Sequence, residues 1–205
     1  MSFQKILITG ATSGIGFEAA NHYLKLGWRV IFTGRNEDKI ASATAKLLDA
    51  TSTPEQLLGI LCDNAIPQHY STLVTEISEK VGMLDAVILN AGVFYPKLFS
   101  DTVYSELEQT MLVNFTGPVM LLQTLLPVLN NPCSVVYVSS IVVERAFVTA
   151  SSYSASKAAF EAYANVLNLE LAPRGIRVNY LRPGGTATEI QGKAGMSQSQ
   201  VAELN

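Results

Sequence analysis

Short apolar runs alternate along the chain with longer segments of mixed polarity. Runs of four to six mainly apolar residues favour strands that are buried on both faces of a sheet. The predicted strands are Lys5–Thr9, Arg29–Thr33, Leu58–Cys62, Leu84–Leu89, Ser134–Val138 and Ile176–Leu181.

The segments between these runs have the length and spacing of helices. Their apolar residues recur mainly three or four positions apart, as they do along one face of a helix. The predicted helices are Ile15–Leu26, Asn36–Ala50, Pro67–Val81, Tyr104–Leu129 and Tyr153–Ala172. Asn36 is placed to cap the second, Pro67 to open the third and Gly175 to end the fifth. The alternation predicts an α/β fold with a doubly wound parallel sheet, of six strands as far as the chain runs.

The composition is that of a folded domain with a large core. Hydrophobic residues make up 48% of the 205 residues and charged residues 15%, against a charged share of about 25% in typical globular proteins. The chain shows no linker, internal repeat or low-complexity tract. Residues 1–205 are therefore predicted to form a single domain.

Charge and hydropathy exclude several classes of partner. The formal net charge is −3 and no run of Lys or Arg occurs, which argues against a nucleic-acid partner. Polar residues interrupt the most apolar stretches, around Gly117–Leu129 and Val135–Ala150, so no membrane association is expected. The N-terminus lacks the apolar core of a signal peptide, which predicts a cytoplasmic protein. Cys62 and Cys133 have no nearby His partners and are interpreted as buried free thiols.

A glycine-rich segment follows the first predicted strand and opens the first predicted helix. Residues 9–16 read Thr-Gly-Ala-Thr-Ser-Gly-Ile-Gly. Glycines allow a tight turn and close approach of a pyrophosphate, and the positive end of the helix favours the anion. The segment predicts a Rossmann-type dinucleotide site, with an ordinary strand-to-helix turn as the alternative. The candidate residues are Gly10, Thr12, Ser13, Gly14, Ile15 and Gly16.

The end of the second predicted strand bears on the choice of cofactor. An NAD site usually places a carboxylate here for the ribose 2′-hydroxyl, but the sequence reads Gly34-Arg35. Arg35 can pair with a 2′-phosphate and stack on adenine. We therefore expect NADP(H) rather than NAD(H); a solvated surface arginine is the alternative.

Tyr153 and Lys157 have the spacing of a catalytic pair. Residues four apart on a helix share a face, so a phenol and an ammonium become neighbours. The ammonium and an oxidised nicotinamide would stabilise the phenolate and bring the Tyr153 pKa toward the operating range. The alternative is an ordinary helix-surface pair.

Asn114 lies within a predicted helix, four residues before Pro118. Because proline has no N–H, it cannot bond the Asn114 carbonyl. We expect a kink there and a carbonyl that is free to hold a water. A helix that starts anew at Pro118 is the alternative.

Together these motifs resemble the short-chain dehydrogenase/reductase family, in its compact single-domain branch, from Lys5 to Thr188. The resemblance implies that Ser140 polarises a substrate carbonyl, Tyr153 exchanges the proton and Lys157 binds the nicotinamide ribose. It also implies that Asn114 holds a relay water. Ser140 is preferred to Ser139 because the family's serine lies thirteen residues before its tyrosine. The implied cofactor contacts, besides the glycine-rich segment, Arg35, Tyr153 and Lys157, are Asp63, Asn64, Asn90, Ala91, Gly92, Pro183, Gly184, Thr186 and Thr188.

The sequence departs from the family pattern at two points that bear on the substrate. Val143 stands where a glycine often follows the paired serines, and it is expected to narrow the substrate pocket. The chain also stops soon after Thr188, and residues 197–204 are expected to form a short helix or a mobile tail. The pocket is expected to be partly apolar, flanked by Phe94, Tyr95, Val142, Val143 and Phe147.

The predicted activity is hydride transfer between NADP(H) and a small carbonyl or alcohol substrate, in a homodimer or homotetramer. No metal is expected, because His22 and His69 have no Cys or acidic companions at metal spacing and are interpreted as helix-surface residues. The alternative is a catalytically silent nucleotide-binding regulator or scaffold. A nucleotide-sugar epimerase of the extended branch would need a larger C-terminal domain.

Overall fold

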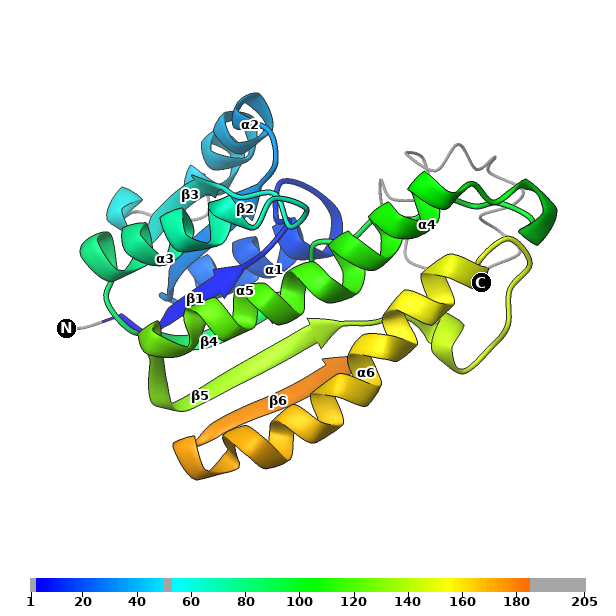
Figure 1. The fold of residues 1–205 in the computed structure, drawn as a ribbon. Helices are drawn as coiled ribbons and strands as arrows, with labels where there is room; N and C mark the ends of the chain where they lie inside the picture. The colour runs from blue at the N-terminus through cyan, green and yellow to red at the C-terminus, as the bar shows by residue number, and fades with distance from the viewer. Residues whose placement is uncertain (1–2, 50–52, 185–205) are drawn as a thin grey trace.

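A computed structural model describes residues 3–49 and 53–184 and contains one sheet of six strands (Figure 1). Every pair of neighbouring strands is parallel, and the order is β3-β2-β1-β4-β5-β6. This confirms the predicted doubly wound parallel sheet. The strands are β1 (Lys5–Ile8), β2 (Arg29–Gly34), β3 (Leu57–Leu61), β4 (Leu84–Leu89), β5 (Leu129–Val138) and β6 (Ile176–Leu181).

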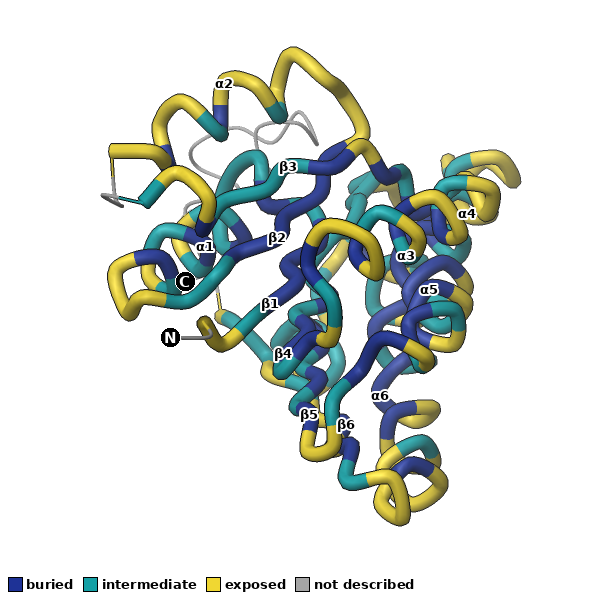
Figure 2. Tube along the Cα trace, turned by 90° about the vertical axis from the view of Figure 1, so that its left-hand side faces the viewer, coloured by how far each residue is buried: buried dark blue, intermediate teal, exposed yellow. Residues whose placement is uncertain are grey.

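Helices cover both faces of the sheet, as Figure 1 shows. Alternate residues of β1 point to opposite faces: Ile6 and Ile8 pack in a core with α1 and α2, whereas Leu7 packs in a core with α3, α5 and α6. Both faces of the central strands are buried, and exposed positions gather on the outer sides of the helices (Figure 2). The helices are α1 (Gly14–Lys25), α2 (Glu37–Leu48), α3 (Gln68–Lys80), α4 (Tyr104–Met111), α5 (Gly117–Leu125) and α6 (Ser151–Leu171).

The predicted helix boundaries are confirmed at three points. The Asn36 side chain accepts a hydrogen bond from the Lys39 amide at 2.9 Å and so caps α2. Pro67 stands immediately before α3. Gly175 has a φ of 66° and ends the turn that follows α6, a left-handed conformation that glycine adopts without steric cost.

The predicted helix over residues 104–129 is wrong as a single element. The structure divides it into α4, a π-helical turn at Leu112–Thr116, α5 and a 3₁₀ turn at Leu126–Val128. Pro118 cannot donate to the Asn114 carbonyl, so the ladder widens there. The expected irregularity around Asn114 is thus confirmed, as a π turn.

The strand β5 begins five residues earlier than predicted, because Leu129 pairs with Leu84 of β4. Two asparagines and Pro132 follow Leu129, and the register shifts there before pairing resumes at Ser134. Polar residues and a proline interrupt the apolar run by which a buried strand is identified.

Among the described residues, one helical stretch, Tyr104–Val128, is long and apolar enough to cross a membrane by length and composition alone. Within its most apolar window, 44% of the residues are buried inside the protein. A core helix of a globular protein meets the same criterion, so this stretch is weak evidence for a membrane span.

Candidate active site

A cavity of about 350 Å³ lies at the carboxyl ends of the strands. Residues that follow each of the six strands line it, and it spans the junction between β1 and β4, where the chain order of the sheet reverses. Ligands of doubly wound sheets bind at this position. Sixteen of the predicted site residues line it: Gly10, Thr12, Ser13, Gly14, Ile15, Arg35, Asp63, Asn64, Asn90, Ala91, Gly92, Ser140, Tyr153, Lys157, Pro183 and Gly184.

Gly16 and Asn114 do not line the cavity, whereas Thr186 and Thr188 lie outside the described residues. A Cβ at Gly16 would lie 2.5 Å from the Asn90 side-chain nitrogen. The structure therefore gives Gly16 a packing role: its lack of a side chain lets α1 approach the loop after β4.

The glycine-rich turn forms a cradle for an anion. Gly10 has a φ of +64°, and a Cβ there would lie 2.7 Å from the Ala91 Cα. The helix α1 begins at Gly14 with Ser13 at its N-cap, so its positive end meets the cavity that both residues line. This is the arrangement that a pyrophosphate requires.

Two threonines support this turn, Thr9 directly before it and Thr33 in β2, although the sequence did not single them out as site residues. The Thr9 hydroxyl accepts the amides of Asn90 and Ala91 at 3.0 and 3.1 Å. The Thr33 hydroxyl accepts the Gly10 amide at 3.3 Å. The Asn90 side chain in turn donates to the carbonyls of Thr9 and Gly10. Asn90 thus holds the loops after β1 and β4 together.

The loop after β3 brings Asp63 and Asn64 to the cavity. The His69 Nδ1 accepts the Asp63 amide at 3.1 Å, and the Asp63 carboxylate accepts the Ala65 amide at 2.9 Å. His69 lies on α3 and is partly exposed, as expected of a helix-surface residue, but its ring also orders this loop, which was not expected. Within the described residues, neither polar atom of the buried Asn64 amide has a hydrogen-bond partner. A buried amide of this kind suits a polar ligand.

These observations fit a nicotinamide dinucleotide. The cradle at Gly10 and Gly14 would hold the pyrophosphate, and Asp63 and Asn64 would face the adenine end. Tyr153 and Lys157 line the same cavity from α6.

Ser140, Tyr153 and Lys157 come together as the sequence predicted. Ser140 and Tyr153 line the same cavity, and the Ser140 side chain acts to lower the Tyr153 pKa. The Lys157 Nζ lies 5.6 Å from the Tyr153 ring centre and donates to the Val138 carbonyl at 2.8 Å. The Ser139 hydroxyl instead donates to the carboxylate of Glu161, which supports the choice of Ser140 as the serine that faces the tyrosine.

The pKa values differ from the sequence-based expectation. Burial raises the pKa of Tyr153 to about 12, and the Ser140 side chain only partly opposes this. Burial lowers the pKa of Lys157 to about 7, while the Glu161 carboxylate acts to raise it. The protein's own groups therefore keep the Tyr153 phenol protonated at neutral pH, and the lowering of its pKa by an oxidised nicotinamide stays a prediction.

The expectation for Asn114 also needs correction. Its carbonyl is released from the helical ladder, but it is not free: it accepts the Tyr137 hydroxyl at 2.6 Å. Its side-chain amide bonds both backbone groups of Val93 and the Ser156 hydroxyl. Asn114 is fully buried and ties the loop after β4 to α6. The sequence could not reveal that Tyr137, distant along the chain, occupies this carbonyl.

The substrate side of the cavity is partly apolar, as expected. Phe94 packs on Tyr153 with 4.9 Å between ring centres, and Tyr95, Val142 and Phe147 also line the cavity. Val143 does not line it, so the expected narrowing by this residue is wrong. Its neighbour Val142 takes that place because the 3₁₀ turn Ile141–Val143 rotates successive side chains.

A second cation, which the sequence did not single out, stands beside Arg35. A shallow hollow next to the cavity is lined by Thr12, Arg35, Asn36 and Lys39. Neither Arg35 nor Lys39 forms an ion pair within residues 3–49 and 53–184. The sequence signal was available, since Lys39 lies four residues after Arg35, in the first turn of the helix that Asn36 caps.

Comparison with known proteins gives consistent matches. The family model for the short chain dehydrogenases matches residues 4–199. Dehydrogenase/reductase SDR family member 7B of Rattus norvegicus is 33% identical over 190 residues, which is 90% of this chain and 58% of that protein. The chain thus spans less than two thirds of this relative's length.

Two solved structures share the fold closely. A short-chain dehydrogenase from Shigella flexneri, complexed with NADP, has a TM-score of 0.89 and 31% identity and covers 100% of this chain and 86% of its own. An actinorhodin polyketide ketoreductase with NADPH has a TM-score of 0.86 and 28% identity, and the match covers 94% of this chain and 76% of its own. On the family model and the site geometry together, the chain belongs to the short-chain dehydrogenase/reductase family of oxidoreductases.

Proposed function

We propose that this chain reduces a carbonyl substrate with NADPH, in a reversible hydride transfer in which Tyr153 is the general acid. The observation that carries the proposal is the meeting of Ser140, Tyr153 and Lys157 in one cavity with the anion cradle of α1. The reduced nicotinamide would supply the hydride when bound.

The chain's own groups suit the reductive direction. The raised pKa of Tyr153 keeps a proton on its hydroxyl at neutral pH, and this proton is the one that a developing alkoxide needs. Ser140, which lines the cavity with Tyr153, would share the negative charge on the carbonyl oxygen. Lys157 would bind the nicotinamide ribose from the next turn of α6.

The preference for NADP(H) rests on Arg35 and Lys39. Both line the hollow beside the glycine-rich turn, together with Thr12 and Asn36. That hollow contains two cations and no carboxylate, so it suits a 2′-phosphate better than a ribose diol. Two solved relatives contain this cofactor: the short-chain dehydrogenase from Shigella flexneri is complexed with NADP, and the actinorhodin ketoreductase contains NADPH.

The test follows the transfer of deuterium from labelled NADPH to the substrate. NADPH that carries deuterium at the transferable C4 position is incubated with the protein and a panel of aldehydes and ketones. The proposal expects an alcohol that is one mass unit heavier at the carbinol carbon. Tight NADPH binding without turnover on the whole panel would instead favour a catalytically silent binder.

A further inference from the structure

Beneath the catalytic face, a buried carboxylate joins three elements. Glu161 lies on α6, one turn after Lys157, and its side chain is only 5% exposed. It accepts the Ser139 hydroxyl from the end of β5. It also accepts Arg182 Nε at 3.0 and 3.1 Å and Arg182 Nη2 at 2.6 Å.

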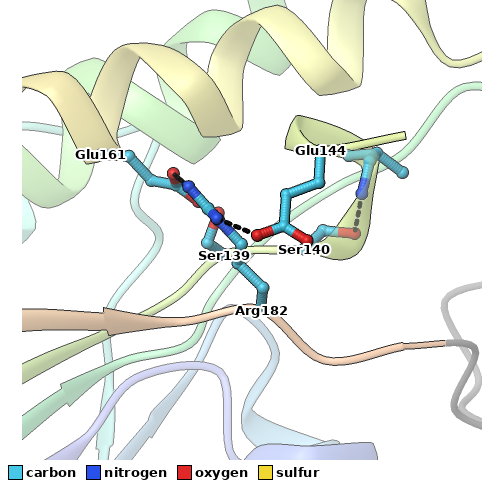
Figure 3. Close-up of polar contacts among 6 residues, drawn as sticks. Ser139, Ser140, Glu144, Glu161 and Arg182 are labelled. Carbon is cyan, nitrogen blue, oxygen red and sulfur yellow. Dashed lines mark hydrogen bonds and ion pairs between the residues drawn. The ribbon is translucent and has the colours of Figure 1, made fainter. Parts of the chain in front are cut away.

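Arg182 has a second carboxylate partner on the other side. Its Nη1 donates to Glu144, which directly follows the 3₁₀ turn Ile141–Val143. Figure 3 shows the guanidinium of Arg182 between Glu161 and Glu144. Arg182 thus contacts Glu144 at one end of the segment 139–144 and reaches Ser139 at the other end through Glu161.

Ser140 lies inside this segment and depends on it for position. Its hydroxyl accepts the Val142 amide at 3.4 Å, a long contact, and it lines the cavity together with Tyr153. Backbone bonds from Ser139 to Leu181 and from Ile141 to Pro183 attach the segment to the chain on either side of Arg182. Arg182 therefore lies between the two backbone bonds that join the Ser140 turn to the start of the Pro183-Gly184 loop, which lines the cavity.

The chemistry of the network favours a geometric role over one in stability. A buried carboxylate loses much of its hydration, and a paired arginine offsets that loss without a large net gain. The ion pair between Arg182 and Glu144 is half exposed, and ion pairs of this kind contribute little to the free energy of unfolding. A planar guanidinium that bonds two carboxylates does, however, set their relative positions.

We propose that Glu161, Arg182 and Glu144 form a clamp that positions the Ser140 turn against Tyr153. The clamp residues do not touch the reacting atoms; they act through Ser139 and Ser140. This inference deepens the proposed carbonyl reduction and rests on it.

The test compares Glu144→Ala and Arg182→Lys with the wild type, and uses Glu76→Gln as the matched control. Glu144 is half exposed, so its loss is compatible with folding; Glu76 forms an exposed ion pair with Lys80 on α3. We expect kcat with the carbonyl to fall about tenfold in both clamp variants, because sub-ångström misplacement of an acting group slows the chemical step. The dissociation constant for NADPH should stay within about twofold, and Glu76→Gln should match the wild type.

The double variant Glu144→Ala/Arg182→Lys tests whether the two side chains act together. If both side chains act as one clamp, Glu144→Ala adds little to the loss already caused by Arg182→Lys. A kcat for Glu144→Ala within twofold of the wild type would overturn the clamp. An equal loss of NADPH affinity would also overturn it, since that result indicates general disruption of the site.

Amide hydrogen exchange separates the clamp from the proposed function. In Glu144→Ala, the amides of residues 139–144 should exchange faster than in the wild type, with those of β1 and β2 unchanged. A wild type without turnover on any carbonyl contradicts the proposed function alone. Unchanged exchange at 139–144 contradicts the clamp, whatever the activity.

Discussion

Tyr153 and Lys157 lie one helical turn apart on α6, and burial moves their pKa values in opposite directions. Removal from water disfavours the charged form of each group, so the phenol pKa rises to about 12 and the ammonium pKa falls to about 7. The sequence spacing predicted the pair but not this effect, because desolvation depends on what the fold packs around α6. The Tyr137 ring is one of the groups packed there, with its centre 4.6 Å from the Lys157 Nζ.

Burial of Lys157 predicts a pH dependence of stability. The folded protein holds this amine at a pKa of about 7, against 10.5 ordinarily, so between pH 7 and 9 the unfolded chain binds more protons. The free energy of unfolding should therefore rise with pH in this window, by up to about 1.4 kcal/mol per unit from this residue.

Urea unfolding of the cofactor-free protein between pH 7 and 9 measures this slope. Lys157→Met should flatten it, whereas Lys25→Met, which changes an exposed lysine at the end of α1, should not. Equal slopes for the wild type and Lys157→Met would show that the ammonium is not destabilised in the folded state.

Arg35 gives a second prediction at this scale. Arg35→Ala removes a cation from the hollow beside the cavity. A hydrogen bond to a charged group contributes about 1.5–3 kcal/mol, so the KM for NADPH should rise roughly 10- to 100-fold.

The same variant with NADH is the control, since NADH lacks the 2′-phosphate. Its KM should stay within about twofold. A parallel rise for both cofactors, or none for either, would contradict a 2′-phosphate site at Arg35.

At the scale of elements, the six strands, the doubly wound parallel class of the sheet and most helices could be predicted, because the alternation of local apolar patterns indicates them. The exceptions have two physical causes. Residues 104–129 have a continuous helical pattern, but Pro118 creates a π turn and Leu129 pairs with β4. His69 looks like a surface residue of a helix, but the fold brings the Asp63 amide to its ring. The π turn has a local cause in Pro118, whereas contacts that no apolar pattern contains decide the start of β5 and the role of His69.

The close approach of α5 to the loop after β3 is testable. A Cβ at Gly117 would lie 2.3 Å from the Asn64 carbonyl oxygen and 2.8 Å from that of Leu112. Because both neighbours are backbone, Gly117→Ala should lower the free energy of unfolding by about 1–3 kcal/mol and weaken NADPH binding through Asn64.

Gly184→Ala is the matched substitution for the stability measurement, since a Cβ there meets nothing within 4 Å among the described residues. Its urea midpoint should equal that of the wild type. A Gly117→Ala midpoint equal to both would show that the two segments can separate at little cost.

At the scale of the whole molecule, the outer face of α6 exposes three large apolar side chains to solvent. Tyr163, Val166 and Leu169 are 42%, 54% and 75% exposed. Contiguous exposed apolar side chains of this kind mark interaction surfaces. We propose that a second copy of the chain covers this face, in a homodimer or homotetramer. A cytoplasmic location stays a prediction.

Light scattering tests this proposal. Val166→Glu should reduce the molar mass in solution to that of a single chain, because a buried unpaired carboxylate opposes association. Leu26→Glu places the same charge at an exposed residue at the end of α1 and should leave the mass unchanged. A wild type that is already a monomer, or an unchanged mass for Val166→Glu, would rule out this interface.

The residues that form the candidate site could be predicted, but their pKa values could not. Motifs at the ends of parallel strands must meet at one edge of the sheet. Gly10, Asn90 and Ser140 come together for this reason, and α6 adds Tyr153 to the same cavity. The clamp of Arg182 could not be predicted, since its partners lie 21 and 38 residues away and no spacing rule connects them.

Turnover by Tyr153→Phe is the decisive measurement for the proposed chemistry. The variant loses only the hydroxyl that is proposed to donate the proton, while its ring can still pack on Phe94. With the best carbonyl from the panel and saturating NADPH, kcat should fall by about 10²- to 10⁴-fold, with NADPH affinity within about threefold of the wild type. Turnover by Tyr153→Phe equal to that of the wild type would contradict the assignment of Tyr153 as the acid.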